Sequence, residues 1–345
     1  MRTLVISDLH LGSRLGRDVL RHPEALNQLL AALDDVDRLV LLGDTIELAE
    51  GRPHQVMRAA EPVLRAIGAR LGPEREVVLV PGNHDAALTQ RWTRARGEAL
   101  TVDAQVPPDA TPRLSRVTSW LAPAQIRVHA PGVWLSSRVW ATHGHYLDRH
   151  LLPESAWGMT RERFGRTAAE RVGPSVYEGR RRASRTRVES ELVRSLPRPL
   201  ALLIEDAAEL LRAATMPNPR RLPSHRLAPL TARLLGVQMQ RASIPALAHV
   251  THRLGVEADW VLFGHVHRAG PLPGDDEALW AGQDRRPRVA NTGCWVYEPL
   301  VLHGGRPPHP YWPGSGLVVV DEGDPEVVSL LDDVDVAGLF ARGRG

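Results

Sequence analysis

Three apolar runs near the N-terminus each pass into a polar turn and then into helical periodicity, and this alternation constrains the fold more than any other feature. "TLVISD" leads into a helix that begins near Pro23, "RLVLLGD" into "PHQVMRAAEPVLRAIGARL", and "EVVLVPGNHD" into "AALTQRWTRAR". Strands that alternate with helices predict an α/β core with parallel strands. In such sheets a ligand binds beyond the carboxyl ends of the strands, where each run here turns polar.

The rest of the chain divides into a continuation of this core and an insertion. Residues 97–125 read as a Pro-rich loop with one short helix, and "QIRVHAPGVWL" and "SRVWATHGH" predict two further strands. Helical periodicity broken by prolines follows over residues 147–257, and strands return with "DWVLFGHVH", "PRVANTGCWVY", "SGLVVVDEG" and "EVVSLL". We therefore predict a core of residues 1–146 and 258–345, with a mainly helical cap at 147–257.

The composition indicates the size of the fold and the cellular compartment of the protein. The chain has 345 residues, of which 43% are apolar, enough for one large domain or two smaller ones. It contains no apolar run of the length that spans a membrane, and its first residues lack the pattern of a secretory signal. Its one cysteine, Cys294, cannot form an internal disulfide, which fits a reducing compartment. These features predict a cytoplasmic protein.

Arginine is concentrated in the predicted cap. Residues 146–258 carry 19 Arg against 11 Asp and Glu, although the net charge of the whole chain is only +3. Guanidinium groups bind phosphate in a bidentate manner, so Arg180 and Arg187, in "RRRASRTR", either contact an anionic substrate or lie on a solvated helix face. No aromatic residues interleave this run, which argues against a nucleic-acid partner. The amphipathic stretch 198–214 either packs within the cap or contacts a membrane surface peripherally.

Residues that bind metals follow the ends of five predicted strands. Side chains two residues apart share one face of a strand, so Asp8 and His10 can converge on one point. Carboxylate, imidazole and amide oxygen together suit Mn, Fe or Zn better than Ca, which prefers oxygen ligands alone. The glycines that precede three of these residues allow sharp turns and a close approach of the backbone to a ligand. The five groups are Asp8 and His10, Asp44, Asn83 with His84 and Asp85, His143 with His145, and His265 with His267.

The order of these motifs, DxH, GD, GNHD, HGH and GHxH, resembles the calcineurin-like metallophosphoesterases. The resemblance spans residues 8–267, and "NTGCWVY" is similar to the sheet segment that follows in that family. It implies a four-layer αββα sandwich, in which two mixed β-sheets lie between helical layers. It also implies two divalent metal ions and hydrolysis of a phosphate ester or diester by in-line attack of a hydroxide that bridges them.

The resemblance also implies a role for each motif residue. Asp85 would orient the imidazole of His84, the proton donor to the leaving group; the residues themselves also allow Asp85 to be the N-cap of the helix that follows, a role compatible with the first. His143 directly follows its strand and is the expected ligand, whereas His145 would contact a ligand or the substrate, or replace His143. The first ion would be held by Asp8, His10 and His267, the second by Asn83, His143 and His265, and Asp44 would bridge them.

Within the family, "ISDLHLG", "GDTIE" with Glu47, "GNHD", and "HGH" followed by Asp148 most resemble the UDP-diacylglucosamine pyrophosphatase branch. The chain departs from that branch in its longer cap and in HGH, where the branch usually has HGD. A phosphorylated small molecule, nucleotide or lipid is the expected substrate, with Glu47 and His145 as further candidate substrate-binding residues. One alternative is a pyrophosphatase acting on a nucleotide-linked or lipid-linked substrate at the membrane surface. Another is a non-catalytic, metal-containing scaffold, which the complete set of ligand positions disfavours.

Overall fold

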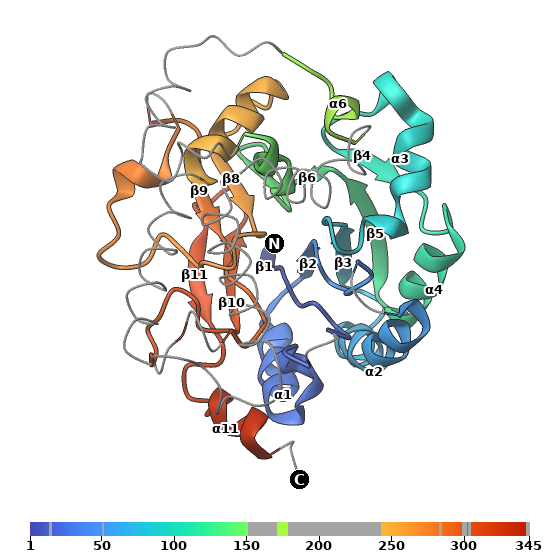
Figure 1. Cartoon of the computed structure of the whole chain (residues 1–345), viewed down its shortest axis with the longest axis vertical. Helices are drawn as coiled ribbons and strands as arrows, with labels where there is room; N and C mark the ends of the chain where they lie inside the picture. Colours follow the sequence, from blue (N-terminus) through green and yellow to red (C-terminus); the bar gives the residue numbers. More distant parts are fainter. Residues whose placement is uncertain are drawn as a thin grey trace, which may run out of the picture.

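Two β-sheets form the centre of the computed structural model (Figure 1). The larger sheet has the strand order β11-β10-β1-β2-β3-β5-β4, and the smaller has the order β6-β7-β8-β9. The pairs β1–β2, β2–β3, β3–β5, β7–β8 and β8–β9 are parallel, and the remaining pairs are antiparallel, so both sheets are mixed. The strands are β1 (Arg2–Ile6), β2 (Arg38–Leu42), β3 (Glu76–Val80), β4 (Ala104–Val106), β5 (Gln125–Ala130), β6 (Gly132–Trp134), β7 (Val139–Thr142), β8 (Trp260–Phe263), β9 (Arg288–Asn291), β10 (Ser315–Val320) and β11 (Glu326–Ser329).

The central strands are apolar on both faces because each face is covered. Alternate residues of a strand point to opposite faces of its sheet. Val5, Val40 and Val78 accordingly pack between the two sheets, against residues of the smaller sheet such as Leu262. Their neighbours along the same strands pack instead against the helices outside the larger sheet. This double burial explains why the strands read as continuous apolar runs rather than as alternating patterns.

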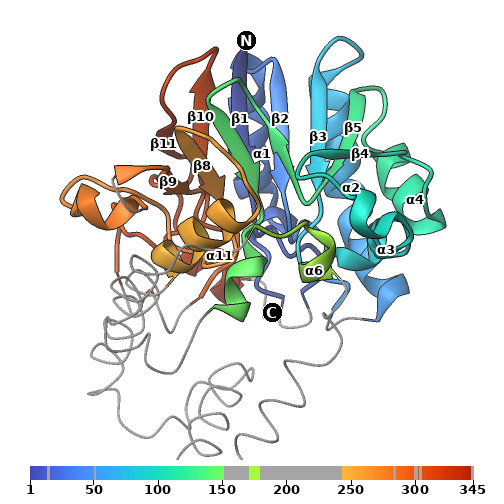
Figure 2. The same ribbon diagram turned by 90° about the horizontal axis from the view of Figure 1, so that it is seen from above.

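Helices cover the outer faces of both sheets (Figure 2). Helices α1, α2 and α4 bury apolar side chains against the larger sheet. A helical segment at residues 243–253 packs Leu247 and Val250 against Val261 and Phe263 of the smaller sheet. The predicted four-layer sandwich is therefore confirmed. The helices are α1 (Pro23–Ala32), α2 (Pro53–Leu71), α3 (Gln90–Arg96), α4 (Pro112–Trp120), α6 (Ser175–Glu178) and α11 (Val336–Arg342), with short 3-10 helices at Val19–Arg21, Leu33–Asp35, Ala86–Leu88, Gly97–Ala99, His145–Arg149 and Glu277–Trp280.

Proline marks where the covering helices begin. Pro23, Pro53 and Pro112 each occupy the first turn of a helix, where a missing N–H costs nothing and a fixed φ is already helical. The side chain of Thr111 caps α4 by accepting a hydrogen bond of 3.1 Å from the backbone N–H of Leu114. The predicted helix starts at Pro23 and Pro53 are confirmed.

Two local predictions differ from the structure. The segment "QIRVHAPGVWL" was expected to be one strand, but it forms β5 in the larger sheet and β6 in the smaller. Pro131 separates the two strands, because it has no N–H to donate to a ladder. The expected loop at residues 97–125 contains the predicted short helix, α4, and also β4, which pairs with β5 as an edge strand.

The structure describes residues 1–13, 16–49, 52–150, 171–178, 243–282, 285–298, 302 and 305–342. Most of the predicted cap lies outside these residues, as do Arg180, Arg187 and the amphipathic stretch 198–214. The division into core and cap thus stays a prediction. No helix among the described residues is long and apolar enough to cross a membrane.

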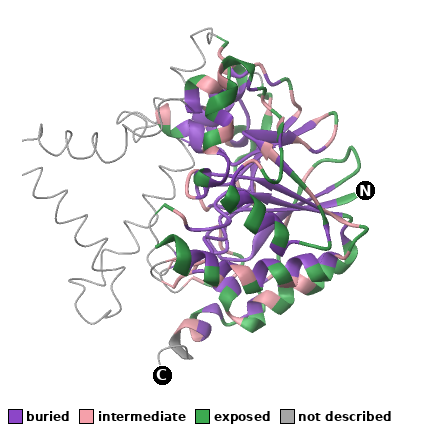
Figure 3. Ribbon diagram, turned by 90° about the vertical axis from the view of Figure 1, so that its right-hand side faces the viewer, coloured by how far each residue is buried: buried purple, intermediate pink, exposed green. Residues whose placement is uncertain are grey.

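Most strand residues are buried (Figure 3), and two neighbouring valines on β10, one buried and one exposed, test the packing between the two sheets. Val319 packs between the sheets and is 2% exposed, whereas the side chain of Val320 points outward and is 45% exposed. We expect Val319→Ala to lower the free energy of unfolding by about 2 kcal/mol, since it leaves a cavity. Val320→Ala should change it by less than about 0.5 kcal/mol. Chemical denaturation measures both, and equal losses would contradict the layer assignment.

Candidate metal centre

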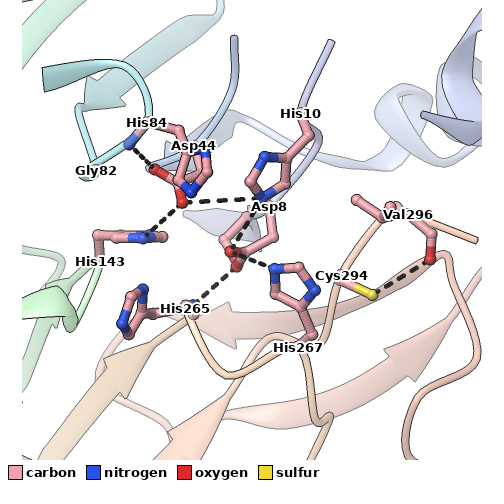
Figure 4. A network of polar contacts seen from close by, with 12 residues as sticks. Asp8, His10, Asp44, Gly82, His84, His143, His265, His267, Cys294 and Val296 are labelled. Carbon is pink, nitrogen blue, oxygen red and sulfur yellow. Dashed lines mark hydrogen bonds and ion pairs between the residues drawn. The ribbon is translucent and has the colours of Figure 1, made fainter. Parts of the chain in front are cut away.

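The structure brings the five motifs to one place, at the carboxyl ends of strands from both sheets (Figure 4). The loops after β1 and β2 stay paired beyond the strands: Asp8 N–H donates to the carbonyl of Gly43 (3.0 Å) and His10 N–H to that of Asp44 (2.8 Å). In the smaller sheet, Gly264 N–H donates to the carbonyl of His143 (3.1 Å). The loop backbones therefore continue the parallel register of the strands, and this pairing fixes the positions of the side chains in the site.

Backbone strain is concentrated at these same residues. Seven non-glycine residues in the described part of the chain have positive φ, and five of them belong to the motifs. Such conformations cost of order 1–3 kcal/mol each and persist where the surroundings enforce them, often at functional sites. The five are Asp8 (55°), His10 (43°), Asp44 (50°), His265 (70°) and His267 (59°).

Asp8 is oriented so that one carboxylate oxygen accepts hydrogen bonds from neighbouring residues and the other faces imidazoles. Oδ2 accepts hydrogen bonds from the hydroxyl of Ser7 and, at 2.9 Å, from the backbone N–H of His265. Oδ1 lies 3.2 Å from His267 Nε2 and 3.9 Å from His10 Nε2. Both Asp8 Oδ1 and His10 Nε2 are buried without a hydrogen-bond partner. Buried polar atoms of this kind are the positions that a metal ion would satisfy.

Asp44 is divided in the same way and lies between two groups of possible ligands. Its Oδ1 accepts a hydrogen bond of 2.8 Å from the backbone N–H of His84. Its Oδ2 lies 3.1 Å from His143 Nε2 and 3.8 Å from His10 Nε2. Asp44, His143 and His265 place possible ligand atoms within 4.8 Å of one another, as do Asp8, His10 and His267, and a third, overlapping group joins His10, Asp44 and His84.

His143, rather than His145, joins these groups. Its Nδ1 is 3.0 Å from the carbonyl oxygen of Leu42, to which it donates, so Nε2, which faces Asp44, is the nitrogen that a metal ion would bind. Asn83 Oδ1 lies 3.1 Å from the same Nε2. His145 is buried, with its ring 5.5 Å from that of His143, and it belongs to none of the possible ligand groups that the described residues form.

The site contains two buried carboxylates whose negative charge has to be balanced by positive charge. Burial raises the pKa of Asp8, but His267 and His143 outweigh burial and lower it to about 2. Burial likewise raises the pKa of Asp44, and His143 and His10 hold it well below its usual range. Burial lowers the pKa of His143, but Asp44 raises it to about 9. Two ionised carboxylates in a buried site require cations close by, and the donors present fit two divalent metal ions.

Glu47 makes contacts with two histidines of the site that the sequence did not predict. It was a candidate substrate-binding residue, but it is 3% exposed and faces two imidazoles. Its Oε2 lies 2.7 Å from His10 Nδ1 and 2.8 Å from His84 Nδ1. These hydrogen bonds outweigh burial and lower the pKa of Glu47 to about 2. The sequence signal was available in "GDTIE", where a glutamate follows the buried Ile46 in a loop that leaves the sheet.

Asp85 does not orient His84, contrary to the prediction. Its carboxylate accepts hydrogen bonds from the backbone N–H groups of Gly82 (2.6 Å), Thr45 (2.8 Å) and Ile46 (3.4 Å). Asp85 does occupy the N-cap position of the 3-10 helix Ala86–Leu88, as the alternative prediction has it, but its side chain makes no cap hydrogen bond. Asp85 instead ties the loop after β3 to the loop after β2.

Two glycines leave the room that this packing needs. Gly43 has φ of 87°, and a Cβ there would lie 2.3 Å from Nδ1 of His143. A Cβ on Gly82 would lie 2.3 Å from Oδ1 of Asp44. At both glycines the backbone lies as close to a possible ligand as predicted. At Gly43 the backbone also makes the predicted sharp turn.

Comparison with known proteins agrees with the site. The family model described as calcineurin-like phosphoesterase matches residues 1–269. The chain therefore belongs to the calcineurin-like phosphoesterases. It is a hydrolase of a family that acts on phosphate esters with two divalent metal ions.

The other two comparisons concern curated proteins and solved structures. No curated protein matches the chain. Two crystal structures of cold-active protein tyrosine phosphatase, one of a mutant and one from a psychrophilic Shewanella species, are each 14% identical to the chain, with TM-scores of 0.31 and 0.30. The matches cover 96% and 95% of this chain and 78% and 80% of those chains. At these TM-scores the likeness carries no argument about function.

A pair of glycine variants tests the close packing around Asp44. We expect Gly82→Ala to lower the stability by about 1–3 kcal/mol and to weaken Mn2+ binding, because its Cβ would displace the Asp44 carboxylate. Gly173→Ala is the matched control, since a Cβ there would meet only Ser175 Oγ at 3.7 Å. Thermal unfolding and calorimetric Mn2+ titration measure the two effects. Equal Mn2+ affinity in both variants would refute the role of Gly82.

Proposed function

We propose that the chain is a binuclear phosphoesterase in which Asp44 is shared between two metal ions. The proposal rests on the position of Asp44. Its Oδ2 faces His143, which belongs to the ligand group with His265, and His10, which belongs to the ligand group with Asp8 and His267. Asp8, His10 and His267 complete one ligand set, and Asn83, His143 and His265 complete the other. When bound, such a metal pair lowers the pKa of water and neutralises charge on the transferring phosphoryl group.

The protein's own residues supply the proton for the leaving group. His84 is partly exposed at the centre, with its Nδ1 held by the ionised carboxylate of Glu47. A carboxylate at Nδ1 keeps a proton on that nitrogen and stabilises the positively charged ring. Nε2 is then the atom that gives its proton to the departing oxygen. We therefore assign the general acid to His84 and the orientation of its ring to Glu47.

The substrate is proposed at the level that the family supports, a phosphate ester or diester. Every predicted ligand position is filled by a residue able to bind metal, which favours an active enzyme over a scaffold protein.

Hydrolysis of matched aryl phosphate esters tests the reaction class. With Mn2+ present, we expect the protein to hydrolyse an aryl phosphomonoester or phosphodiester and to bind two ions per chain. Asp44→Ala should bind fewer ions and lose the activity, because both ligand sets lose a shared carboxylate. Asp103→Ala, an exposed aspartate whose side chain contacts Thr101, is the matched control and should retain both. Full turnover by Asp44→Ala would disprove the shared ligand, and a protein that binds no Mn2+ would disprove the class.

The dependence of rate on the leaving group tests the proton donor. We expect His84→Ala to keep both metal ions and to lose about 100-fold in rate or more, most severely with poor leaving groups. Glu47→Gln should show the same steepened dependence, because it removes the charge that supports the donor.

Asp85→Asn is the control, since it changes a buried carboxylate beside His84 that does not touch its ring. It should lower the unfolding temperature and leave the leaving-group dependence unchanged. A steeper dependence in Asp85→Asn, together with none in Glu47→Gln, would show that Asp85, and not Glu47, orients the ring of His84.

A further inference from the structure

A carboxylate outside the predicted ligand sets contacts the metal centre. Asp148 lies on the 3-10 helix His145–Arg149, in the first turn of the chain after His143. Its Oδ1 is 2.8 Å from Nε2 of His265, a residue 117 positions further along the chain. The side chain of His265 is 10% exposed and that of Asp148 is 40% exposed. The pair therefore sits where the buried centre meets the surface.

This contact determines which nitrogen of His265 is available. An imidazole nitrogen that donates to a carboxylate carries the proton, and the other nitrogen keeps its lone pair. With Nε2 bound to Asp148, His265 presents Nδ1 to the centre. His10 and His143 are arranged in the opposite way, since their Nδ1 atoms contact Glu47 and the carbonyl of Leu42. Those two rings present Nε2 to the centre, so the ligand set mixes both nitrogens.

The turn that carries Asp148 is itself held in place. Leu147 is fully buried, and its N–H donates to the carbonyl of Gly144 at 2.9 Å. The guanidinium of Arg149 donates to the carbonyls of Val176 (2.6 Å) and Tyr177 in the segment 171–178. Asp148 is thus flanked by two anchored residues, and its carboxylate approaches His265 from a fixed backbone.

We propose that Asp148 is a positioning residue that holds His265 as an Nδ1 ligand of the ion shared by Asp44, His143 and His265. The inference rests on the proposed function for the identity of that ion. Asp148 follows His143 at the start of the predicted cap. The position of this first turn therefore affects how tightly one of the two ions is bound. Carboxylates that orient a ligating histidine commonly change metal affinity 10–100-fold when removed.

Mn2+ titration of the full chain tests this assignment, with calorimetry for affinity and electron paramagnetic resonance for the state of the ions. We expect Asp148→Ala to bind one Mn2+ as the parent does and the other about 10–100-fold more weakly. At intermediate Mn2+, its spectrum should show isolated ions where the parent shows a coupled pair. Asp148→Asn should lose less affinity, because its amide oxygen still accepts the Nε2 proton. Asp103→Ala is the control for charge and should match the parent.

A second pair of variants separates failure of this inference from failure of the proposed function. His265→Ala should lose the ion that Asp44, His143 and His265 share. Adding Asp148→Ala to this variant should have no further effect, since Asp148 acts only through His265. Parent-like affinities and spectra in Asp148→Ala, with the ion lost in His265→Ala, would overturn the positioning role and leave the metal assignment standing. Two ions retained in His265→Ala would overturn both.

Discussion

The structure depends on the burial of two ionised carboxylates side by side. Asp8 and Asp44 follow adjacent parallel strands, and both are almost completely inaccessible to solvent. Taking such charges out of water is costly unless they are paired and hydrogen-bonded. Backbone N–H groups of His265 and His84 satisfy one oxygen of each. The other oxygens face imidazoles, an arrangement that is stable and useful with cations between them.

The two sheets contribute different parts of this arrangement. The larger sheet supplies the carboxylates and His10 from the loops after β1 and β2, and these loops stay hydrogen-bonded to each other. The smaller sheet supplies His143 and His265 from the ends of β7 and β8. The apolar layer between the sheets therefore sets the distance between the two halves of the centre. Packing in that layer and chemistry at its edge are linked, because close-packed interiors transmit small displacements.

The misread residues show where local inference ends. Asp85 follows His84 directly, yet consecutive residues in a turn point apart, and its carboxylate serves backbone N–H groups of another loop. Glu47 is distant from His84 in sequence and adjacent in space. Pro131 was read inside one strand, but it marks the crossing from one sheet to the other. Each error concerns a contact made across loops or sheets, on which sequence spacing carries no information.

The sequence by itself determined the strand–helix alternation, the helix starts at prolines and the residue types at the strand ends. These are local properties, set by periodicity, by backbone preferences and by the chemistry of individual side chains. Only the tertiary structure decided which oxygen of Asp8 and Asp44 faces the centre, which nitrogen each histidine presents, and that Glu47 and Asp148 hold the rings of His84 and His265. Those choices depend on hydrogen bonds between segments that meet only when both sheets are packed together.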